Sequence, residues 1–364
     1  MIYTVVYISL LEPLVDWYKK GHRDLPWRRT RDPYRIWISE IMLQQTRVEA
    51  VIPYYERFLK NLPTIRDLAE CPEDKLLKLW EGLGYYSRVR NLQKAARVIE
   101  EKFGGAMPKD HDAILSLPGI GPYTAGAISS IAFDLPYSAV DGNALRILTR
   151  VLCDDRNIGD EKTKKSIMQD MDGAIQSRTW NFSPGDLNQA MMELGATVCL
   201  PNGEPKCEIC PWKEVCLSRS RGTWQDYPVK TKAKARRIEE RTVLLIRDGD
   251  RVLLKKRPKK GLLAGLYEFP GLEGYVSEKE ALHYAKQLGL DPLFIEKGRE
   301  AKHIFSHVEW HMRSFLIRVA SVDVDKKNKS WLLAELDQAR DIYAIPSAFK
   351  AYTEYLWGGS NSFR

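Results

Sequence analysis

The 364-residue sequence lacks any apolar run near the roughly 18 residues that a membrane-spanning helix requires. Its first eleven residues are apolar, but they lack a basic segment and are followed by Glu12-Pro13, which argues against a secretory signal. Internal repeats and low-complexity segments are also missing. We therefore expect a cytoplasmic protein without membrane association.

Cysteine is scarce outside one short segment. Of six cysteines, Cys71 and Cys153 stand alone, and the other four follow the pattern Cys-x7-Cys-x2-Cys-x5-Cys from residue 199 to residue 216. In a sequence without an export signal, such clustering favours metal ligation over disulfides. Four thiolates can hold Zn²⁺ or a [4Fe–4S] cluster, and ligand type alone does not separate the two.

The composition fits a soluble globular protein, with 44% hydrophobic and 29% charged residues. Lys and Arg outnumber Asp and Glu by 56 to 48, a net charge of +8. This excess suits a polyanionic partner, although a basic enzyme without one would look the same. The length is sufficient for two ordinary domains.

Hydrophobic periodicity divides the chain. Residues from about 9 to 200 are expected to be almost entirely helical, with Gly104-Gly105 ending one helix and the Ser183 hydroxyl capping another. Residues 228–241 carry six basic and two acidic residues without periodicity, which is typical of a linker. We predict a helical domain at 1–221, a basic linker at 222–240 and an α+β domain at 241–364.

The α+β domain is predicted from alternating apolar runs and turn residues. An Asp248-Gly249 turn between two apolar runs indicates a hairpin. The predicted strands are Thr242–Ile246, Val252–Leu254, Leu293–Glu296, His303–Val308 and Ser314–Val319, and the predicted helices are Ser277–Leu288 and Ser347–Trp357.

A glycine-containing turn lies between two helical stretches, in the sequence LPGIGPYTAGAI at residues 117–128. Gly119 and Gly121 permit a tight turn whose backbone N–H groups suit a phosphate. A plain interhelical turn is the alternative. The segment at about 110–133 resembles the helix-hairpin-helix element of DNA-binding proteins.

Asp141 begins the next helix, in VDGNALRIL, and would ordinarily be interpreted as an N-cap. Its place about twenty residues after the hairpin resembles that of the catalytic aspartate in the helix-hairpin-helix glycosylase superfamily. Superfamily members that also cut the DNA strand carry a lysine just after the hairpin. Tyr123 stands there in this sequence and cannot form a Schiff base, so the resemblance implies a monofunctional enzyme.

Three further segments resemble the adenine DNA glycosylase (MutY) family: residues 25–37, 38–46 and 82–92. The family chemistry needs an acid to protonate adenine and a carboxylate to stabilise an oxocarbenium-like sugar. Glu40, within an apolar segment, fits the acid, and Asp141, at a helix N-terminus, fits an ionised partner. Taken alone, Glu40 would be interpreted as a solvated helix glutamate.

The same resemblance assigns other residues to the substrate. Tyr123 and Asn143 are expected to assist at the sugar. Gln45 and Tyr85 are expected to enter the base stack vacated by the flipped adenine, although core packing is an alternative for Tyr85 and Trp27. The complete set of expected substrate and DNA contacts is Arg23, Trp27, Arg28, Leu43, Gln45, Thr46, Tyr85, Gly119, Gly121, Gln189, Phe305, Ser306 and His307.

The cysteine segment 199–216 resembles the iron–sulfur loop of the endonuclease III group, which usually has six residues in the first gap where this sequence has seven. The resemblance implies a [4Fe–4S] cluster held by Cys199, Cys207, Cys210 and Cys216. A structural role for the cluster is expected.

Gly261–Gly271 resembles the start of a Nudix fold, but the glutamate-rich Mg²⁺-binding motif is missing, since Ser277–Leu288 supplies only Glu278 and Glu280. We predict no nucleotide hydrolase activity. In the adenine glycosylase family this domain recognises 8-oxoguanine, and Phe305-Ser306-His307 matches the recognition loop.

The sequence thus predicts a monomeric, bacterial-type, nucleoid-associated enzyme that excises adenine paired with 8-oxoguanine or G from double-stranded DNA. The alternatives are an endonuclease III-like glycosylase/lyase, which Tyr123 opposes, and a noncatalytic iron–sulfur damage sensor, which Glu40 and Asp141 oppose. A nucleotide pyrophosphohydrolase is opposed by the missing Nudix motif.

Overall fold

The computed structural model describes residues 3–177, 179–231, 235–322 and 330–357. The chain divides into two compact units, Met1–Glu70 with Arg90–Lys232 and Cys71–Val89 with Ala233–Arg364. Residues 232–234, inside the predicted linker, lie outside the described residues. Among the helices of the described ranges, none combines the length and the apolar character needed to cross a bilayer.

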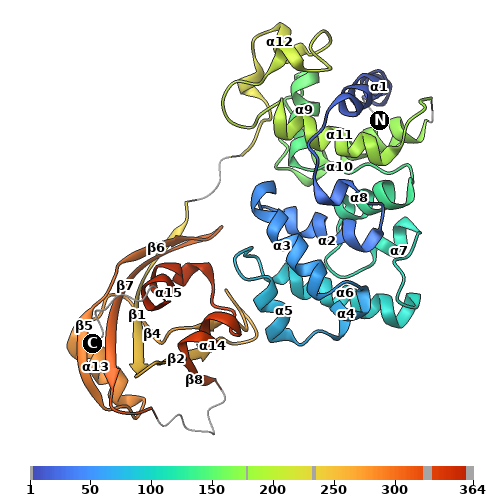
Figure 1. Ribbon diagram of the computed structural model, residues 1–364. Helices are drawn as coiled ribbons and strands as arrows, with labels where there is room; N and C mark the ends of the chain where they lie inside the picture. The colour runs from blue at the N-terminus through green and yellow to red at the C-terminus, as the bar shows by residue number, and fades with distance from the viewer. Residues whose placement is uncertain (1–2, 178, 232–234, 323–329, 358–364) are drawn as a thin grey trace. The chain divides into compact units, whose positions relative to one another are not determined.

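The N-terminal part of the chain is helical, as predicted (Figure 1). Its helices are α1 (Thr4–Lys20), η1 (Pro26–Arg28), α2 (Pro33–Leu43), α3 (Val48–Asn61), α4 (Ile65–Glu70), α5 (Glu73–Leu79), α6 (Ser87–Phe103), α7 (His111–Leu115), α8 (Pro122–Phe133), α9 (Gly142–Leu152), α10 (Glu161–Gln176), α11 (Pro184–Thr197), η2 (Cys207–Ile209), α12 (Leu217–Ser220) and η3 (Trp224–Asp226).

The core of the first unit forms where α1 and α9 pack on α11, where α10 packs on α1, and where α2 packs on α3 and α8. Each helix contributes one apolar face, through residues such as Leu14, Ile147, Met171 and Leu194, all at most 1% exposed. The arrangement brings α2, α8, α9 and α11 around one cavity, although residues 33 and 197 are far apart in the sequence.

The predicted helix ends are mostly confirmed. Helix α6 ends at Phe103, before Gly104 and Gly105, which both adopt positive φ. Helix α11 begins after Ser183, but the predicted hydroxyl cap is wrong. The Ser183 hydroxyl instead donates to the Asp134 carboxylate, since a charged acceptor forms the stronger hydrogen bond.

The second unit contains a mixed eight-stranded sheet in which β3-β2-β1-β7-β5 are neighbours, with β4 added to β1, β6 to β7 and β8 to β2. Strands β1 and β7 are parallel, and the other pairs are antiparallel. The strands are β1 (Arg237–Asp248), β2 (Arg251–Lys256), β3 (Tyr267–Glu268), β4 (Gly271–Glu273), β5 (Pro292–Lys297), β6 (Ala301–Ile304), β7 (Val308–Val319) and β8 (Trp331–Glu335).

Helices cover both faces of this sheet. On β1, Val243 and Leu245 pack with α14 (Leu336–Asp341), η4 (Ser347–Phe349) and α15 (Lys350–Trp357). Leu244 and Ile246 pack with α13 (Glu278–Gln287) on the other face. A strand buried on both faces is a continuous apolar run, and this explains the hydrophobic stretch read from the sequence.

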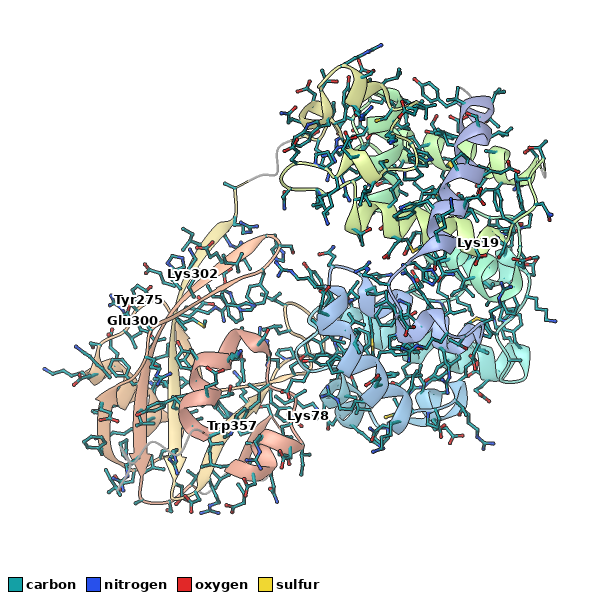
Figure 2. All side chains as sticks on the ribbon, turned by 45° about the horizontal axis from the view of Figure 1, so that its top comes forward. Lys19, Lys78, Tyr275, Glu300, Lys302 and Trp357 are labelled. Carbon is teal, nitrogen blue, oxygen red and sulfur yellow. The ribbon has the colours of Figure 1, made fainter. Side chains whose placement is uncertain are left out.

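Several strand predictions change in the structure, and β7 begins at Val308, earlier than the predicted Ser314. Strand β1 starts at Arg237, earlier than the predicted Thr242, because it pairs with β7 from that residue onward. The predicted single strand His303–Val308 is wrong: β6 ends at Ile304, and residues 305–307 form a turn closed by the Phe305 N–H donating to the Val308 carbonyl at 2.8 Å. Lys302 on β6, labelled in Figure 2, pairs with Glu309 across this hairpin.

Candidate active site

A cavity of about 640 Å³ opens among α2, α8, α9 and α11 of the first unit. Its size is in the range of small-ligand sites. Twelve of the residues predicted to act on the substrate line it: Arg23, Trp27, Arg28, Glu40, Leu43, Gln45, Thr46, Gly121, Tyr123, Asp141, Asn143 and Gln189. Sequence positions up to 166 residues apart therefore meet in one concave site.

Glu40 lies on the buried face of α2 and is only 4% exposed. Its helical neighbours Ile36, Trp37 and Ile41 are buried as well, so the carboxyl group has little access to water. Burial raises the pKa of Glu40 to about 7, although the Tyr123 hydroxyl, which donates to Glu40 Oε2 at 2.6 Å, opposes the rise. At neutral pH this carboxyl group therefore exchanges a proton readily.

Asp141 is the N-cap of α9 and also faces the cavity. Its Oδ1 accepts from the Ala144 N–H at 2.7 Å, and its Oδ2 accepts from Asn143 Nδ2 at 2.7 Å. The pKa of Asp141 lies above its ordinary value, because burial raises the pKa more than these hydrogen bonds lower it. The N-cap interpretation is confirmed, and the same carboxylate also lines the cavity.

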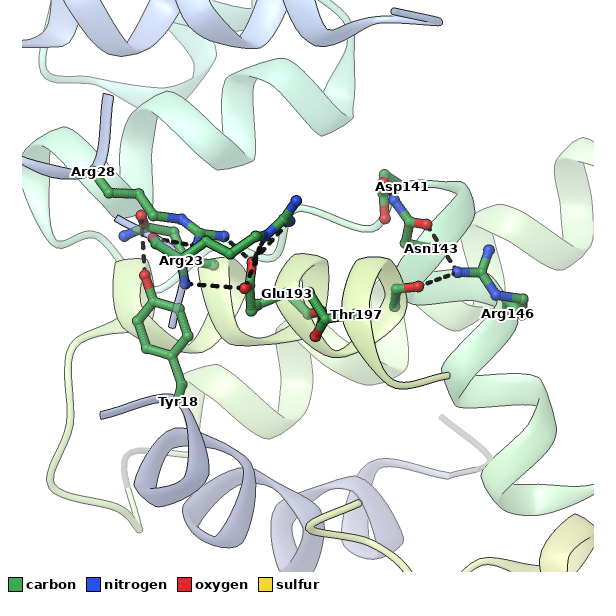
Figure 3. A network of polar contacts seen from close by, with 10 residues as sticks. Tyr18, Arg23, Arg28, Asp141, Asn143, Arg146, Glu193 and Thr197 are labelled. Atoms are coloured by element: carbon green, nitrogen blue, oxygen red, sulfur yellow. Dashed lines mark hydrogen bonds and ion pairs between the residues drawn. The ribbon is translucent and has the colours of Figure 1, made fainter. Parts of the chain in front are cut away.

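A further carboxylate near the cavity residues, the buried Glu193 on α11, was missed from the sequence. It is 2% exposed and pairs with Arg23 at 2.9 Å and with Arg28 at 2.8 Å (Figure 3). Burial would raise the pKa of Glu193, but the hydrogen bonds from Arg23 and Arg28 outweigh it and lower the pKa. Glu193 lies one helical turn after Gln189, so the two side chains share a face of α11, and this spacing was the available sequence signal that Glu193 belongs near the cavity.

The two arginines and Trp27 are fixed from several sides. Arg28 also donates to the Arg23 carbonyl at 3.1 Å and stacks on Tyr18, 5.5 Å from the ring centre. Trp27 contacts Tyr55 edge-on, with centroids 5.5 Å apart, while lining the cavity. Packing and pocket roles therefore coincide for Trp27.

A chain of hydrogen bonds runs from Asp141 to the cysteine loop, and Figure 3 shows its members Asp141, Asn143 and Arg146. Asn143 donates to Asp141 and accepts from Arg146 Nη2 at 2.9 Å. Arg146, 7% exposed, also donates through Nε to the Cys199 carbonyl at 3.0 Å and through Nη2 to the Gly195 carbonyl at 2.7 Å. The position of Asn143 therefore depends on the start of the loop.

The four clustered cysteines line one cavity of about 30 Å³ with Arg150 and Trp224. None of these four cysteines forms a disulfide. Arg150 Nη1 donates to Cys199 Sγ at 3.3 Å. Within the described residues, no group of three or more His, Cys, Asp or Glu side chains is arranged closely enough to hold a metal ion. A set of four thiols with an arginine nearby suits thiolate ligation of iron or zinc by its chemistry.

The hairpin predicted to contact phosphate lies between α7 and α8. Gly119 adopts φ +78°, and a Cβ there would stand 2.5 Å from Asn91 Cβ, so glycine is required. Gly121 is the N-cap of α8 and contributes to the cavity wall, whereas Gly119 is not among the lining residues. The turn thus presents the N-terminus of α8 beside the cavity.

Two of the predicted stack-entering residues have left-handed backbones. Gln45, at the cavity, has φ 58°, and Tyr85, in the second unit, has φ 46°. Non-glycine residues adopt this region infrequently, and such strain collects at functional sites. Tyr85 is 48% exposed, which excludes core packing as its role.

Phe305, Ser306 and His307 form the turn between β6 and β7 of the second unit. Phe305 packs edge-on against Trp310 at 4.8 Å, whereas Ser306 and His307 are exposed. Arg236 Nε donates to the Phe305 carbonyl at 3.1 Å. The turn therefore has a partly buried aromatic anchor and two exposed polar side chains.

On α13, where Nudix enzymes carry their metal-binding glutamates, Glu280 is engaged in a capping box. Its carboxylate accepts from the Ser277 N–H at 2.7 Å and from the Ser277 hydroxyl at 2.8 Å. This acid therefore stabilises the start of the helix.

Both halves of the chain match known families. Residues 38–172 match the HhH-GPD superfamily of base excision DNA repair proteins, and residues 242–355 match the NUDIX domain. A solved thermostable thymine-DNA glycosylase aligns with 60% of this chain and 97% of its own, at a TM-score of 0.52 and 29% identity. The predicted fold class, a helix-hairpin-helix glycosylase domain followed by a Nudix-like α+β domain, is confirmed.

Curated relatives extend over most of the chain. An adenine DNA glycosylase of Buchnera aphidicola is 36% identical, covering 84% of this chain and 85% of its own. The adenine DNA glycosylase of Mus musculus is 35% identical, covering 95% of this chain and 78% of its own. With the carboxyl-lined cavity and both domains in place, the chain belongs to the adenine DNA glycosylase family and is a base excision repair glycosylase.

Proposed function

We propose that this enzyme excises adenine paired with 8-oxoguanine or with G from double-stranded DNA, acts as a monomer, and leaves the strand uncut. The observation that carries the proposal is the pair Glu40 and Asp141 in one cavity, with different surroundings. Glu40 has an apolar environment and a pKa near 7, whereas Asp141 is bound by two N–H donors. Two such carboxyl groups suit acid catalysis and charge stabilisation respectively.

Glu40 supplies the proton. Because the Tyr123 hydroxyl donates to Oε2, a proton on Glu40 resides on Oε1 and is available to adenine N7. Proton transfer neutralises the leaving group, and the electrons of the C1′–N9 bond pass to the purine as the bond breaks. Tyr123 positions the acid and has no amine with which to attack the sugar.

Asp141 stabilises the oxocarbenium-like sugar that remains. The Ala144 N–H and Asn143 favour its ionised form, and α9 adds the positive end of its dipole. Water then bonds to C1′ and loses a proton, which yields an abasic site. Asn143 and Tyr123 thus assist through the two carboxyl groups that they contact.

The remaining cavity residues select adenine. Trp27, Arg28 and Gln189 line the cavity, and Glu193 fixes Arg28 together with Arg23. A base enters only after extrusion from the stack, which costs a few kcal/mol. Gln45 and Tyr85 fill the gap, Leu43 and Thr46 contact the strand near it, and Gly119 and Gly121 present N–H groups to phosphates.

The opposite base is recognised by the turn of residues 305–307. Ser306 and His307 are exposed and polar, so they are available to hydrogen bond to an oxidised guanine, while Phe305 anchors the turn. Support for this role is the family membership and the NUDIX match over residues 242–355.

Cys199, Cys207, Cys210 and Cys216 would hold a [4Fe–4S] cluster. Their shared cavity, their free thiols and the neighbouring Arg150 fit a thiolate-ligated group. Such a group supplies a structural cross-link to the loop at 199–216 when bound.

The test is a single-turnover assay on duplexes with A paired with 8-oxoguanine, G, C or T, each with and without alkali. We expect alkali-dependent cleavage of the first two pairs alone. Cleavage without alkali, together with a borohydride-trapped adduct, would show a lyase instead. Binding without release of adenine from any pair would favour a noncatalytic damage sensor.

A further inference from the structure

The short loop between α5 and α6 presents Tyr85 to solvent. Within residues 82–85 of this loop, three of the four residues have positive φ, with Gly82 at 101°, Gly84 at 67° and Tyr85 at 46°. Leu83, the fourth residue of this stretch, is 6% exposed and anchors the loop. A large exposed aromatic on such a backbone needs neighbours that fix it, because its own conformation is disfavoured.

Arg88, in the first turn of α6, binds this loop through its backbone carbonyl groups. Its Nη2 donates to the Leu83 carbonyl at 2.9 Å and to the Gly84 carbonyl at 3.2 Å. Its backbone N–H donates to the Tyr85 carbonyl at 2.9 Å. Trp80 Nε1 adds a second bond to the Gly84 carbonyl, at 3.0 Å. One arginine thus contacts three consecutive carbonyl groups of the loop.

The Arg88 guanidinium also lies between two aromatic rings. Its central carbon is 5.2 Å from the ring centre of Trp80 and 5.7 Å from that of Tyr85. Trp80 is fully buried, so the guanidinium connects a fixed indole to the exposed phenol ring. Burial lowers the pKa of Arg88 to about 10, and the group is still charged at neutral pH.

We propose that Arg88 is a positioning residue for Tyr85, holding both the strained loop and the ring in the orientation needed to enter the base stack. This inference rests on the proposed function, in which Tyr85 fills the space left by adenine. A ring fixed before DNA arrives loses less conformational freedom on insertion. Lysine cannot replace arginine here, because an ammonium group lacks the planar array of donors and the stacking surface.

The experiment is a double-mutant cycle with Arg88→Lys, Tyr85→Ala and the double variant. Two quantities are measured: the single-turnover rate of adenine release, and the fluorescence of 2-aminopurine placed beside the mispair, which reports on unstacking. We expect Arg88→Lys to reduce the rate of adenine release about tenfold and to reduce the fluorescence change as well. In the Tyr85→Ala background, we expect Arg88→Lys to reduce the rate by less than about twofold further.

Arg97→Lys is the matched control, since Arg97 also lies on α6 and donates from Nε to a backbone carbonyl, that of Ala69, at 3.1 Å. We expect its rate to be within about twofold of wild type. A general folding defect in Arg88→Lys would lower the rate equally with and without Tyr85. Equal losses in both backgrounds, or a loss no greater than that of Arg97→Lys, would overturn the proposal.

The fluorescence measurement separates the two hypotheses, because it is also made with Glu40→Gln, in which extrusion is expected without bond cleavage. If wild type unstacks the base in an Arg88-dependent way but releases no adenine, the proposed function fails and the positioning role stands. If wild type causes no fluorescence change, Tyr85 does not enter the stack and the positioning role is overturned as well.

Discussion

The cavity of the helical unit and the turn between β6 and β7 place their polar groups in opposite surroundings. Glu40 is 4% exposed and acquires a pKa of about 7, whereas Ser306 and His307 stand in solvent. Proton transfer to a base profits from desolvation, because burial tunes the acid. Recognition of an opposite base needs polar atoms that an incoming partner can reach. In the proposed function this difference divides the work, because the first unit carries out the reaction and the second unit recognises the opposite base.

The largest expected effect comes from the two cavity carboxyl groups. Glu40→Gln removes the proton donor and Asp141→Asn removes the charge that stabilises the sugar, so each should lower single-turnover adenine release by roughly 10²–10⁴-fold. DNA binding, measured by fluorescence anisotropy, should remain near wild type.

The matched control is Glu56→Gln, an exposed glutamate of α3, for which no change in rate is expected. Near-normal release by either cavity variant would break the comparison, since the buried site would then not be the reacting one.

The pH dependence of the rate should follow Glu40. Its pKa of about 7 means that the acid loses its proton as the pH rises through 7, so release should fall about tenfold per unit well above this value. The alkaline limb should be measured by single-turnover assays from pH 5.5 to 9. A rate independent of pH between 7 and 9 would contradict the assignment of Glu40 as the acid.

Glu40 also makes stability depend on pH. A carboxyl group whose pKa is raised on folding costs nothing below its unfolded value and destabilises the protein increasingly as the pH rises toward 7. Glu40→Gln should therefore unfold with a free energy roughly 1–3 kcal/mol higher than wild type at pH 8, with little difference near pH 4. Urea unfolding of both proteins at pH 4 and at pH 8 checks this. If the difference in unfolding free energy between variant and wild type were the same at the two pH values, the buried charge would be excluded as the cause of the difference.

The bond network behind Asp141 should have an intermediate effect. Arg146→Gln leaves buried carbonyl groups without their charged donor, so unfolding should cost about 1–3 kcal/mol less and release should slow. Unaltered release in a destabilised variant would restrict Arg146 to a structural role. Arg97→Lys is again a suitable control.

The smallest effect is expected at the turn. Ser306→Ala with His307→Ala should lower the preference for A paired with 8-oxoguanine over A paired with G by roughly 2–10-fold, the value of one or two hydrogen bonds. The ratio of single-turnover rates measures this, with His283→Ala, an exposed histidine of α13, as the control. An unchanged ratio would show that the opposite base is recognised by other residues and not by the turn at 305–307.

The sequence predicts the helical and α+β parts because their apolar periodicities differ, and the resemblance supplies most of the residues that line the cavity. The residues it misses are those whose roles depend on distant partners. Glu193 meets Arg23 across 170 positions, and Arg146 reaches Cys199 across 53. No local pattern marks such pairs, since buried charges become identifiable only when folding brings their partners together.

The sequence predicts one continuous strand across residues 305–307, where the structure has a turn, and the reason for this error is different. Phe305 and Val308 are good strand residues, and a tight turn with an apolar anchor has no glycine or proline to announce it. Its form follows from the tertiary contact between Phe305 and Trp310. Local propensity therefore indicated a strand where packing produces a corner.

The double use of Asp141, as helix cap and as cavity carboxylate, has a consequence for mutational tolerance. Exchange of an N-cap residue for one without a side-chain acceptor costs about 1 kcal/mol, so most inactivating changes at Asp141 also weaken the domain. Changes at Glu40 relieve a buried charge without removing a helix cap. In a library selected for protein abundance alone, Asp141 variants would therefore become rarer and Glu40 variants more frequent. Substitutions at the two positions would thus change the amount of folded protein in opposite directions.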